Sequence, residues 1–331
     1  MLLWFKYKYK YNANNGIHMN VSNINKLAIC VAILTPITSQ SVFAFSGQGG
    51  AVEVVEKVKN EAIGKAEFFV NDAANKLANA FGEGNTEISI RNLKGDKPDW
   101  SIITTQPLTP LEDDNTRLFW QGSIGSYDQN GDRRTTVNLG LGKRWLVDNE
   151  SAIAGINLFT DYEISSKHSR ASLGGEYRRS NVEINANNYW ALSGTKNVNG
   201  ANEDALDGRD IVFKGQAPYL PWVKVVAKSY HWDRVNQDDI KGDSYGVEMY
   251  LTPESKLEVG RQDDNYMDET TYGKLTYAFG SQTKHPSLQD KVVSKIAWQG
   301  GKNMKDHMLD KVERSNKIMV ESGGIVISRR D

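Results

Sequence analysis

Apolar and polar residues alternate in segments of about ten residues between Asn85 and Phe279, with a turn after each segment. Val137, Leu139 and Leu141, for example, alternate with polar residues or glycine. Because a strand has a period of two, this pattern puts one set of side chains on each face of a sheet. The polar set carries many charges, which favours a transmembrane β-barrel with its apolar face toward lipid and its polar face toward a hydrated lumen.

Twelve such segments follow one another, with lengths near the 9–11 residues that a tilted membrane strand needs. Their connections alternate between long polar loops and tighter turns, as in outer-membrane barrels, whose short turns are periplasmic. The predicted fold is therefore all-β, a 12-stranded antiparallel transmembrane β-barrel with a short N-terminal periplasmic helix and a C-terminal tail. The expected strands are 85–91, 100–108, 116–126, 135–146, 152–162, 170–178, 182–192, 210–219, 222–232, 244–252, 256–263 and 271–279.

The two faces of these strands can be assigned, since a charge on the lipid side at mid-membrane costs roughly 2–4 kcal/mol. Leu139, Leu158 and Leu173 are expected to meet lipid. Aromatic residues near strand ends are expected to form interfacial girdles, among them Trp190, Trp222, Tyr230, Trp232 and Tyr250. The predicted pore-lining residues are Arg117, Gln121, Asn138, Arg144, Asn157, Asp161, Glu176, Arg178, Glu183, Lys214, Lys224, Lys228, Glu248, Glu258 and Lys274.

The N-terminus has the pattern of a secretion signal over 1–44, with lysines before a short apolar run and small residues before a cleavage point between Ala44 and Phe45. Met1 and Met19 both remain possible starts. Residues 45–84 are predicted to contain a periplasmic amphipathic helix. The barrel then spans 85–279, and 280–331 forms a tail that we expect to plug the pore or dock cargo. Its stretch 287–298 is a candidate short helix.

Composition and motifs exclude several kinds of function. The formal charge of −1 gives no basic surface for nucleic acid. The single cysteine, Cys30, lies in the predicted signal, so a disulfide or a cysteine metal site is not expected. No cofactor or metal site is predicted, because the acidic and amide side chains of loop 193–209 do not have calcium-loop spacing and are expected to be solvated.

An enzyme is the less favoured class. His168 and His231 lie near Asp161 and Asp233 in the sequence-based topology, an arrangement that a membrane protease or lipase could use. Solvated loop histidines are the preferred interpretation, and His285 and His307 have no partner pattern in the tail. We therefore predict no catalytic residues.

Several segments resemble the intimin/invasin family, whose members are inverse autotransporters. The resemblance runs from about Phe68 to Ser322, and "LGGEY" at 173–177 with strands on both sides is its most specific part. It implies a twelve-stranded outer-membrane barrel, a periplasmic segment, and a chain that passes back through the pore to an adhesive passenger. The matching stretches are GINLFTDYE (155–163), SRASLGGEYRR (169–179), VEINANNYWALSG (182–194), GRDIVFKGQAPYLP (208–221), EMYLTPESKLEVG (248–260) and KVERSNKIMVES (311–322).

The sequence departs from that family pattern at both ends. It leaves no room for a peptidoglycan-binding module between Phe45 and Ala51, and it ends at Asp331 without a passenger domain. Stand-alone barrels of this kind resemble Zir-type translocators, which implies export of separately encoded proteins. A surface adhesin acting through its outer loops, or a truncated adhesin, remains the alternative.

The expected partners follow from this interpretation. They are outer-membrane lipid, a separately encoded secreted protein as cargo, periplasmic chaperones and the barrel-assembly machinery. Tyr277 and Phe279 supply the aromatic-x-aromatic ending that this machinery reads. The chain is expected to be a monomeric, multi-pass protein in the outer membrane of a Gram-negative bacterium.

Overall fold

The computed structural model describes residues 84–92, 98–109, 115–129, 131–267, 269–279, 283, 285–290 and 293–323. The predicted signal 1–44, its cleavage point between Ala44 and Phe45, and nearly all of the predicted helix segment 45–84 lie outside these residues. No helix within the described ranges is both long and apolar enough to cross a bilayer.

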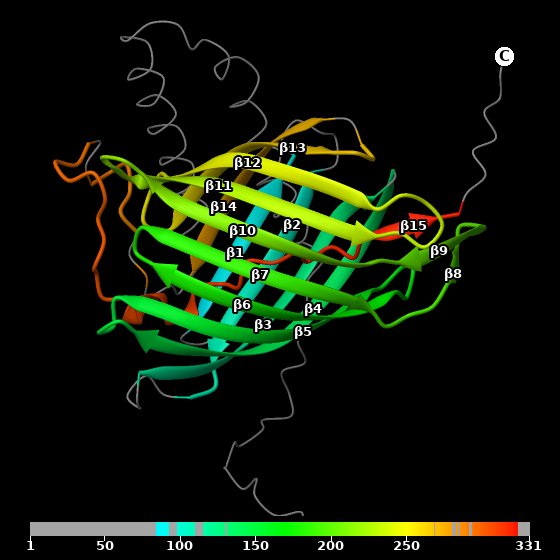
Figure 1. Ribbon diagram of the computed structural model, residues 1–331, viewed down its shortest axis with the longest axis horizontal. Helices are drawn as coiled ribbons and strands as arrows, with labels where there is room; N and C mark the ends of the chain where they lie inside the picture. Colours follow the sequence, from blue (N-terminus) through cyan, green and yellow to red (C-terminus); the bar gives the residue numbers. More distant parts are fainter. Residues whose placement is uncertain are drawn as a thin grey trace, which may run out of the picture. The chain divides into compact units, whose positions relative to one another are not determined.

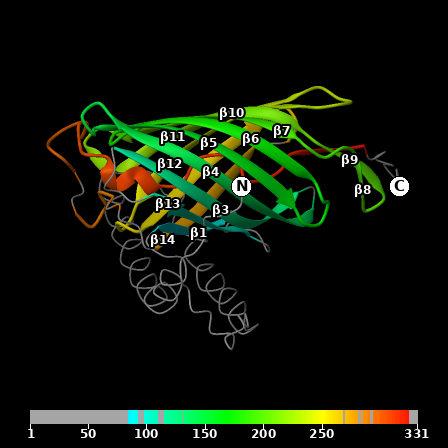
Figure 2. The ribbon, with the colours of Figure 1, turned by 90° about the horizontal axis from the view of Figure 1, so that it is seen from below.

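Twelve antiparallel strands in the described residues close into a barrel, in which each strand pairs with its neighbours and β14 pairs with β1 (Figures 1 and 2). The predicted fold class is confirmed, and most strand ends fall within three residues of the predicted ones. The barrel strands are β1 (Asn85–Arg91), β2 (Asp99–Pro107), β3 (Thr116–Gln129), β4 (Asp132–Val147), β5 (Ala152–Glu163), β6 (Ser169–Arg179), β7 (Val182–Ala191), β10 (Asp207–Ala217), β11 (Leu220–Asp233), β12 (Ile240–Tyr250), β13 (Ser255–Asp264) and β14 (Thr270–Phe279).

Burial alternates along these strands as the hydrophobic pattern requires. Leu139, Leu158 and Leu173 are more than half exposed on the outer face, at 55%, 58% and 51%. Their neighbours Asn138 and Asn157 are buried on the inner face. An apolar exterior around a polar interior is the arrangement expected when hydrocarbon surrounds a barrel.

Two glycines on the inner face make room for aromatic rings. A Cβ added at Gly140 would lie 2.3 Å from the Phe159 ring, and one at Gly142 would lie 2.2 Å from the Phe119 ring. Any side chain there would displace the ring, so β4 can carry only glycine opposite these phenylalanines. The two rings form a buried apolar cluster inside an otherwise polar barrel.

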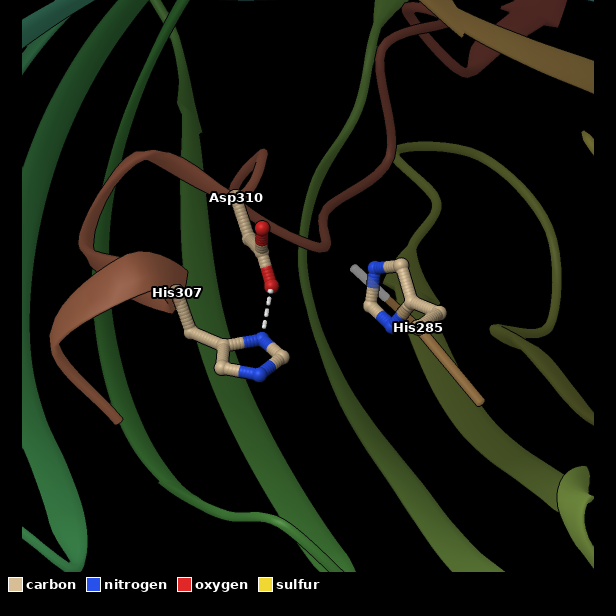
Figure 3. Close-up of side chains that lie close together, drawn as sticks. All are labelled: His285, His307 and Asp310. Carbon is tan, nitrogen blue, oxygen red and sulfur yellow. Dashed lines mark hydrogen bonds and ion pairs between the residues drawn. The ribbon is translucent and has the colours of Figure 1, made fainter. Parts of the chain in front are cut away.

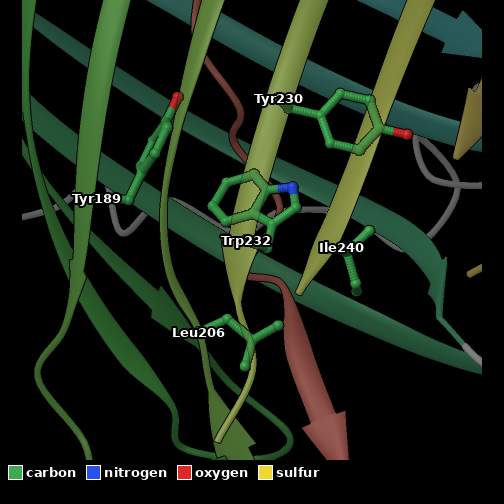
Figure 4. Close-up of a cluster of buried hydrophobic side chains, with 5 residues drawn as sticks. All are labelled: Tyr189, Leu206, Tyr230, Trp232 and Ile240. Carbon is green, nitrogen blue, oxygen red and sulfur yellow. The ribbon is translucent and has the colours of Figure 1, made fainter. Parts of the chain in front are cut away.

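A second cluster corrects the prediction of aromatic girdles. Tyr230 and Trp232 are buried with Tyr189, Leu206 and Ile240 (Figure 4). Trp222 and Tyr250 are also buried, whereas Trp190 is 41% exposed as expected for a girdle residue. Position near a strand end could not separate the two cases, because inward-facing aromatic residues also gather there.

Loop 193–209 was expected to be a solvated polar loop, and most of its acidic and amide side chains are exposed, but Glu203 is buried and the stretch forms regular structure. It contains the hairpin strands β8 (Lys196–Val198) and β9 (Ala201–Ala205), and β9 also pairs with β15 (Val320–Ser322) from the tail. The three strands lie at one end of the barrel (Figure 1).

The tail also differs from its predicted helix. The described residues of 287–298 form turns and bends, and a short 3₁₀ helix, η2, lies later at Lys305–Leu309.

Candidate functional site

Most of the predicted pore-lining side chains are enclosed by the barrel. Eleven of the fifteen are buried, namely Arg117, Gln121, Asn138, Arg144, Asn157, Asp161, Glu176, Arg178, Glu183, Lys214 and Glu248. The other four, Lys224, Lys228, Glu258 and Lys274, are half-buried. Many of them contact the chain's own tail.

Residues 304–323, here called the post-barrel segment, contact the inner wall from one end of the barrel to the other (Figure 1). Met308 packs on Leu146 at the end that carries the β4–β5 turn, here called the turn end. Ile318 packs on Ala205 at the opposite end, which carries the β8–β9 hairpin and is here called the loop end. Between them, Leu309 and Val312 pack on the Phe119 and Phe159 rings.

Wall side chains bind this segment largely through its main chain. Five of them donate hydrogen bonds to six carbonyl oxygens, and each of the five lies on the inner face of a strand between β4 and β7. The pairs are Arg144 to Met308 (2.9 Å) and Asp310 (2.6 Å), Arg178 to Lys311 (2.7 Å), Asn187 to Glu313 (3.0 Å), Arg170 to Ser315 (2.8 Å) and Asn138 to Asn316 (3.2 Å). The Gln121 side chain in turn accepts the Val312 N–H at 2.8 Å.

Ion pairs hold these donors in place. Arg144 Nε donates to Glu176 Oε1 at 2.5 Å, and Arg178 Nη2 lies 2.7 Å from Glu176 Oε2. Arg170 similarly donates to Asp161 Oδ2 at 2.8 Å. The carboxylate partner balances the charge of each buried guanidinium, and the carbonyl partner takes up a further donor, which makes such burial tolerable although Arg170 Nη1 and Arg178 Nε have no hydrogen-bond partner among the described residues.

A smaller set of contacts involves side chains of the segment and not its main chain. Arg314 donates to both oxygens of Asp161, at 2.9 and 2.8 Å, and its guanidinium lies 4.4 Å from the Phe159 ring centroid. Lys214 donates to Glu313 at 2.7 Å. Lys311 pairs with Glu87 at 3.1 Å. These pairs are specific to this sequence, in contrast to the carbonyl contacts.

At the loop end the hairpin is fastened by a buried ion cluster. Glu203 on β9 accepts two hydrogen bonds from Arg134, at 2.5 and 2.7 Å, and lies 3.3 Å from His168 Nε2. His168 is completely buried, so its expected role as a solvated loop histidine is wrong. Burial raises the pKa of Glu203, but the hydrogen bonds from His168 and Arg134 outweigh that effect and lower its pKa to about 2.

The tail is fastened to a neighbouring loop as well. The Glu321 carboxylate on β15 accepts the main-chain N–H of Val235 at 2.7 Å and that of Asn236 at 3.1 Å. Arg234 lies 3.6 Å from the same carboxylate. The β11–β12 connection therefore also holds the tail strand.

At the turn end, three residues of the tail meet that the sequence did not connect. His307 Nδ1 and Asp310 Oδ2 are 2.8 Å apart, and the His285 and His307 ring centroids are 5.4 Å apart (Figure 3). His285 stacks on Tyr250 with a centroid separation of 4.2 Å. Desolvation lowers the pKa of His285 to about 3, so this imidazole is neutral at physiological pH.

The other predicted histidine, His231, has a different setting. Its Nε2 lies 3.2 Å from Asp233 and 3.0 Å from Asp239, as the sequence suggested for Asp233. Arg209 lies 3.3 Å from its Nδ1. Asp161, by contrast, is not a partner of His168, because Arg170 and Arg314 occupy its carboxylate.

The sequence did not identify the residues that fasten the tail at the loop end, nor the residues of the tail that contact the barrel. Arg134 and Glu203 lie in stretches read as polar loops, and nothing local marks them as a pair. In the sequence, only the family resemblance singles out the motif at 311–322. Its mixture of charged and apolar residues is the available signal that it packs against a mixed interior.

Comparison with known proteins agrees with this architecture. Intimin of Escherichia coli O111:H- is 27% identical over 252 residues, which cover 72% of this chain and 25% of intimin. Invasin of Yersinia enterocolitica is 28% identical over 193 residues, covering 54% of this chain and 22% of invasin. The inverse autotransporter adhesin YeeJ of Escherichia coli is 27% identical over 207 residues, covering 57% of this chain and 8% of the adhesin. The chain thus spans a quarter or less of the length of these relatives.

The fold has a counterpart among solved structures. One described as "Unveiling the Mechanism Behind the in-meso Crystallization of Membrane Proteins" superposes with a TM-score of 0.58 at 19% identity. The alignment covers 72% of this chain and 99% of that one. A family model described as "Inverse autotransporter, beta-domain" matches residues 38–316. The resemblance to the intimin/invasin family is thereby confirmed, and the chain belongs to the inverse autotransporter β-domain family, as a multi-pass β-barrel of the outer membrane.

Proposed function

We propose that this barrel exports a separately encoded partner protein across the outer membrane, with the fifteen predicted pore-lining residues along its path. One observation carries the proposal. The inner wall binds an extended polypeptide, the chain's own post-barrel segment, chiefly through main-chain carbonyls. Every polypeptide has such carbonyls, so donors aimed at them suit a passing chain of any sequence.

The same wall limits how tightly a passing chain is held. Its charges are largely paired with one another, as in Arg144 with Glu176 and Arg170 with Asp161. A paired charge attracts a passing side chain of either sign only weakly, because the fields of the two opposite charges largely cancel beyond their own separation. The wall therefore lets a passing polypeptide slide and does not hold it in one position.

The tail, residues 280–331, serves in this proposal as a pore-threading linker that occupies the path until cargo displaces it. Its specific pairs, Arg314 with Asp161 and Lys311 with Glu87, account for its preference over other sequences. Displacement would exchange these pairs for contacts with the incoming chain, while the carbonyl donors keep their role.

Export is tested by deleting the gene and comparing the periplasmic and secreted proteomes by quantitative mass spectrometry. The proposal expects at least one protein to accumulate in the periplasm, to vanish from the medium, and to return there on complementation. Unchanged secretion of every protein would reject it.

A surface adhesin is the second candidate, favoured by one observation. The β8–β9–β15 sheet forms a folded element at the loop end, beyond the barrel strands. The purified barrel should then bind cells or matrix, and removal of residues 195–204 should abolish that binding while the barrel still folds. Absence of binding by the intact barrel would exclude this function for the chain.

We infer that the chain is not an enzyme, although one arrangement resembles a hydrolytic triad. His168 Nδ1 is 2.9 Å from Ser193 Oγ, and its Nε2 faces Glu203. However, Ser193 Oγ already accepts the Ser169 N–H at 3.2 Å, and Arg134 occupies the Glu203 carboxylate on both oxygens. We assign the group to fastening the hairpin.

Assembly completes the proposal. Tyr277 and Phe279 close β14 with ring centroids 4.7 Å apart, at the strand that pairs with β1 to shut the barrel. We propose that the barrel-assembly machinery reads this ending after periplasmic chaperones deliver the chain, and that the folded protein is a monomer in outer-membrane lipid.

A further inference from the structure

The turn end of the barrel carries a cluster with the chemistry of a metal site. His285, His307 and Asp310 each offer one ligand atom, and these atoms all lie within 4.8 Å of one another (Figure 3). The three residues come from two parts of the tail, since η2 carries His307 and about twenty residues separate it from His285.

We propose that His285, His307 and Asp310 bind a single divalent transition-metal ion of the zinc class. Two imidazoles and one carboxylate form a ligand set typical of zinc, which takes nitrogen and oxygen donors at about 2.0–2.2 Å in tetrahedral geometry. Donors at such bond lengths lie about 3.3 Å apart. The His307 Nδ1 and Asp310 Oδ2 atoms, at 2.8 Å, are already near that separation.

The ion would take the place of the hydrogen between His307 Nδ1 and Asp310 Oδ2, and the neutral imidazole would carry its hydrogen on Nε2. A ring nitrogen of His285 is the third ligand, and a movement of about 1–1.5 Å brings it from the observed limit to bonding distance. Among the described residues, no group makes a hydrogen bond to either ring nitrogen of His285, so no existing partner has to be given up.

The surroundings support and position the three ligands. The Thr283 hydroxyl, which has one hydrogen to donate, lies 2.7 Å from both Asp310 Oδ1 and the Asp306 carbonyl oxygen, while Asp310 Oδ2 faces His307. The stacking of His285 on Tyr250 fixes the imidazole plane against the end of β12. Such second contacts commonly orient metal ligands, and their loss costs about 10–100-fold in affinity.

Space for a fourth ligand is present. A cavity of about 370 Å³ is lined by all three residues, and water inside it could complete a tetrahedron. Four cationic side chains line the same cavity and repel a cation, namely Arg178, Arg179, Lys224 and Lys302, and Glu183 and Asp306 offset part of this charge. A bound ion would link residues 283–290 to η2. Because His285 stacks on Tyr250, it would also link them to the barrel wall and so fasten the tail at the turn end.

The test uses the purified full chain in detergent, with Zn²⁺ titrated calorimetrically and Co²⁺ followed by its visible absorption. We expect one saturable site and a Co²⁺ spectrum of tetrahedral intensity. His285→Gln, His307→Gln and Asp310→Asn should each weaken Zn²⁺ binding at least about tenfold. His231→Gln, in the cluster with Asp233 and Asp239 at the loop end, is the matched control and should change nothing.

A further variant shows whether His285 is a metal ligand or only a structural residue. His285→Cys should retain Zn²⁺ binding and add a sulfur-to-cobalt charge-transfer band, because a thiolate can take the place of the imidazole. Folding of each variant is checked by its mobility on unheated gels. The proposal is overturned if the wild-type chain binds no zinc saturably, if folded His285→Gln and His307→Gln variants bind as tightly as wild type, or if only His231→Gln loses binding.

Discussion

Arg144 both stabilises the inner wall of the barrel and binds the tail that crosses the interior. Its guanidinium is completely buried, binds both oxygens of Glu176 and donates to two carbonyls of the tail. Replacement by Ala would leave Glu176 with Arg178 alone and two carbonyls without their donor. Breaking a buried pair in this way costs about 3–5 kcal/mol.

The Arg144→Ala variant should therefore unfold from lipid vesicles at a clearly lower urea concentration than the wild-type barrel. Its unfolding free energy should be about 3–5 kcal/mol lower. Arg179→Ala is the control, because its pair with Asp148 is exposed and solvent screens it. The control should leave the urea midpoint unchanged. Equal effects of the two variants would show that the buried pair has no special role.

Glu203 gives a pH dependence with a defined sign. Its pKa is lowered from an ordinary value of 4.5 to about 2 in the folded chain. The stabilisation is therefore fully present above about pH 4.5 and is lost as the pH falls from there toward 2. We expect the urea midpoints of wild type and Glu203→Gln to differ by a constant amount above pH 5 and to converge as the pH falls to 2. A difference that stays constant over this range would contradict the assignment.

At the scale of strands, the pairing of β15 with β9 fixes the position of the tail at the loop end. Leu206 N–H bonds to Met319 O at 2.9 Å, and Gly323 N–H to Asn202 O at 2.8 Å. Because the pattern alternates along an antiparallel ladder, Val320 and Ala205 form a non-hydrogen-bonded pair, whose Cα atoms lie about 4.5 Å apart. That distance is within the range a disulfide spans.

An Ala205→Cys/Val320→Cys double variant in a Cys30→Ser background should form an internal disulfide in the purified barrel. Ala201→Cys/Val320→Cys is the control, since Ala201 pairs with Val198 instead. The measurement is thiol titration with mass spectrometry of the cross-linked peptide. Equal oxidation of both pairs would mean that the tail does not hold this register.

The elements also show how far sequence reasoning reaches. Strands buried on one face follow from alternation, because lipid and lumen impose opposite polarities on neighbouring residues. The β8–β9 hairpin could not be predicted from 193–209, since its stability comes from Glu203 meeting Arg134 and from pairing with a strand more than a hundred residues later. Phe119 and Phe159 were missed for a related reason. An apolar side chain inside a polar lumen makes sense only once Leu309 and Val312 lie on it.

At the scale of the whole molecule, the barrel and its tail form one hydrogen-bonded unit. The tail crosses the interior between two fastenings, the His307 and Asp310 turn at one end and the β9–β15 pairing at the other. Arg170 and Asn187, which were not predicted, help to hold it between these ends. Six of the predicted pore-lining residues do so as well, namely Gln121, Asn138, Arg144, Asp161, Arg178 and Lys214. If the same residues carry cargo, the tail and the cargo must compete for the interior.

The most direct measurement of this claim is cargo export through a barrel whose tail is locked. Cells carrying Ala205→Cys/Val320→Cys are compared with the Ala201→Cys/Val320→Cys control, with release of the protein identified in the deletion strain as the readout. We predict that the oxidised double variant stops release, that reductant restores it, and that the control exports normally. Undiminished export by a fully oxidised, correctly inserted barrel would contradict a shared path through the interior.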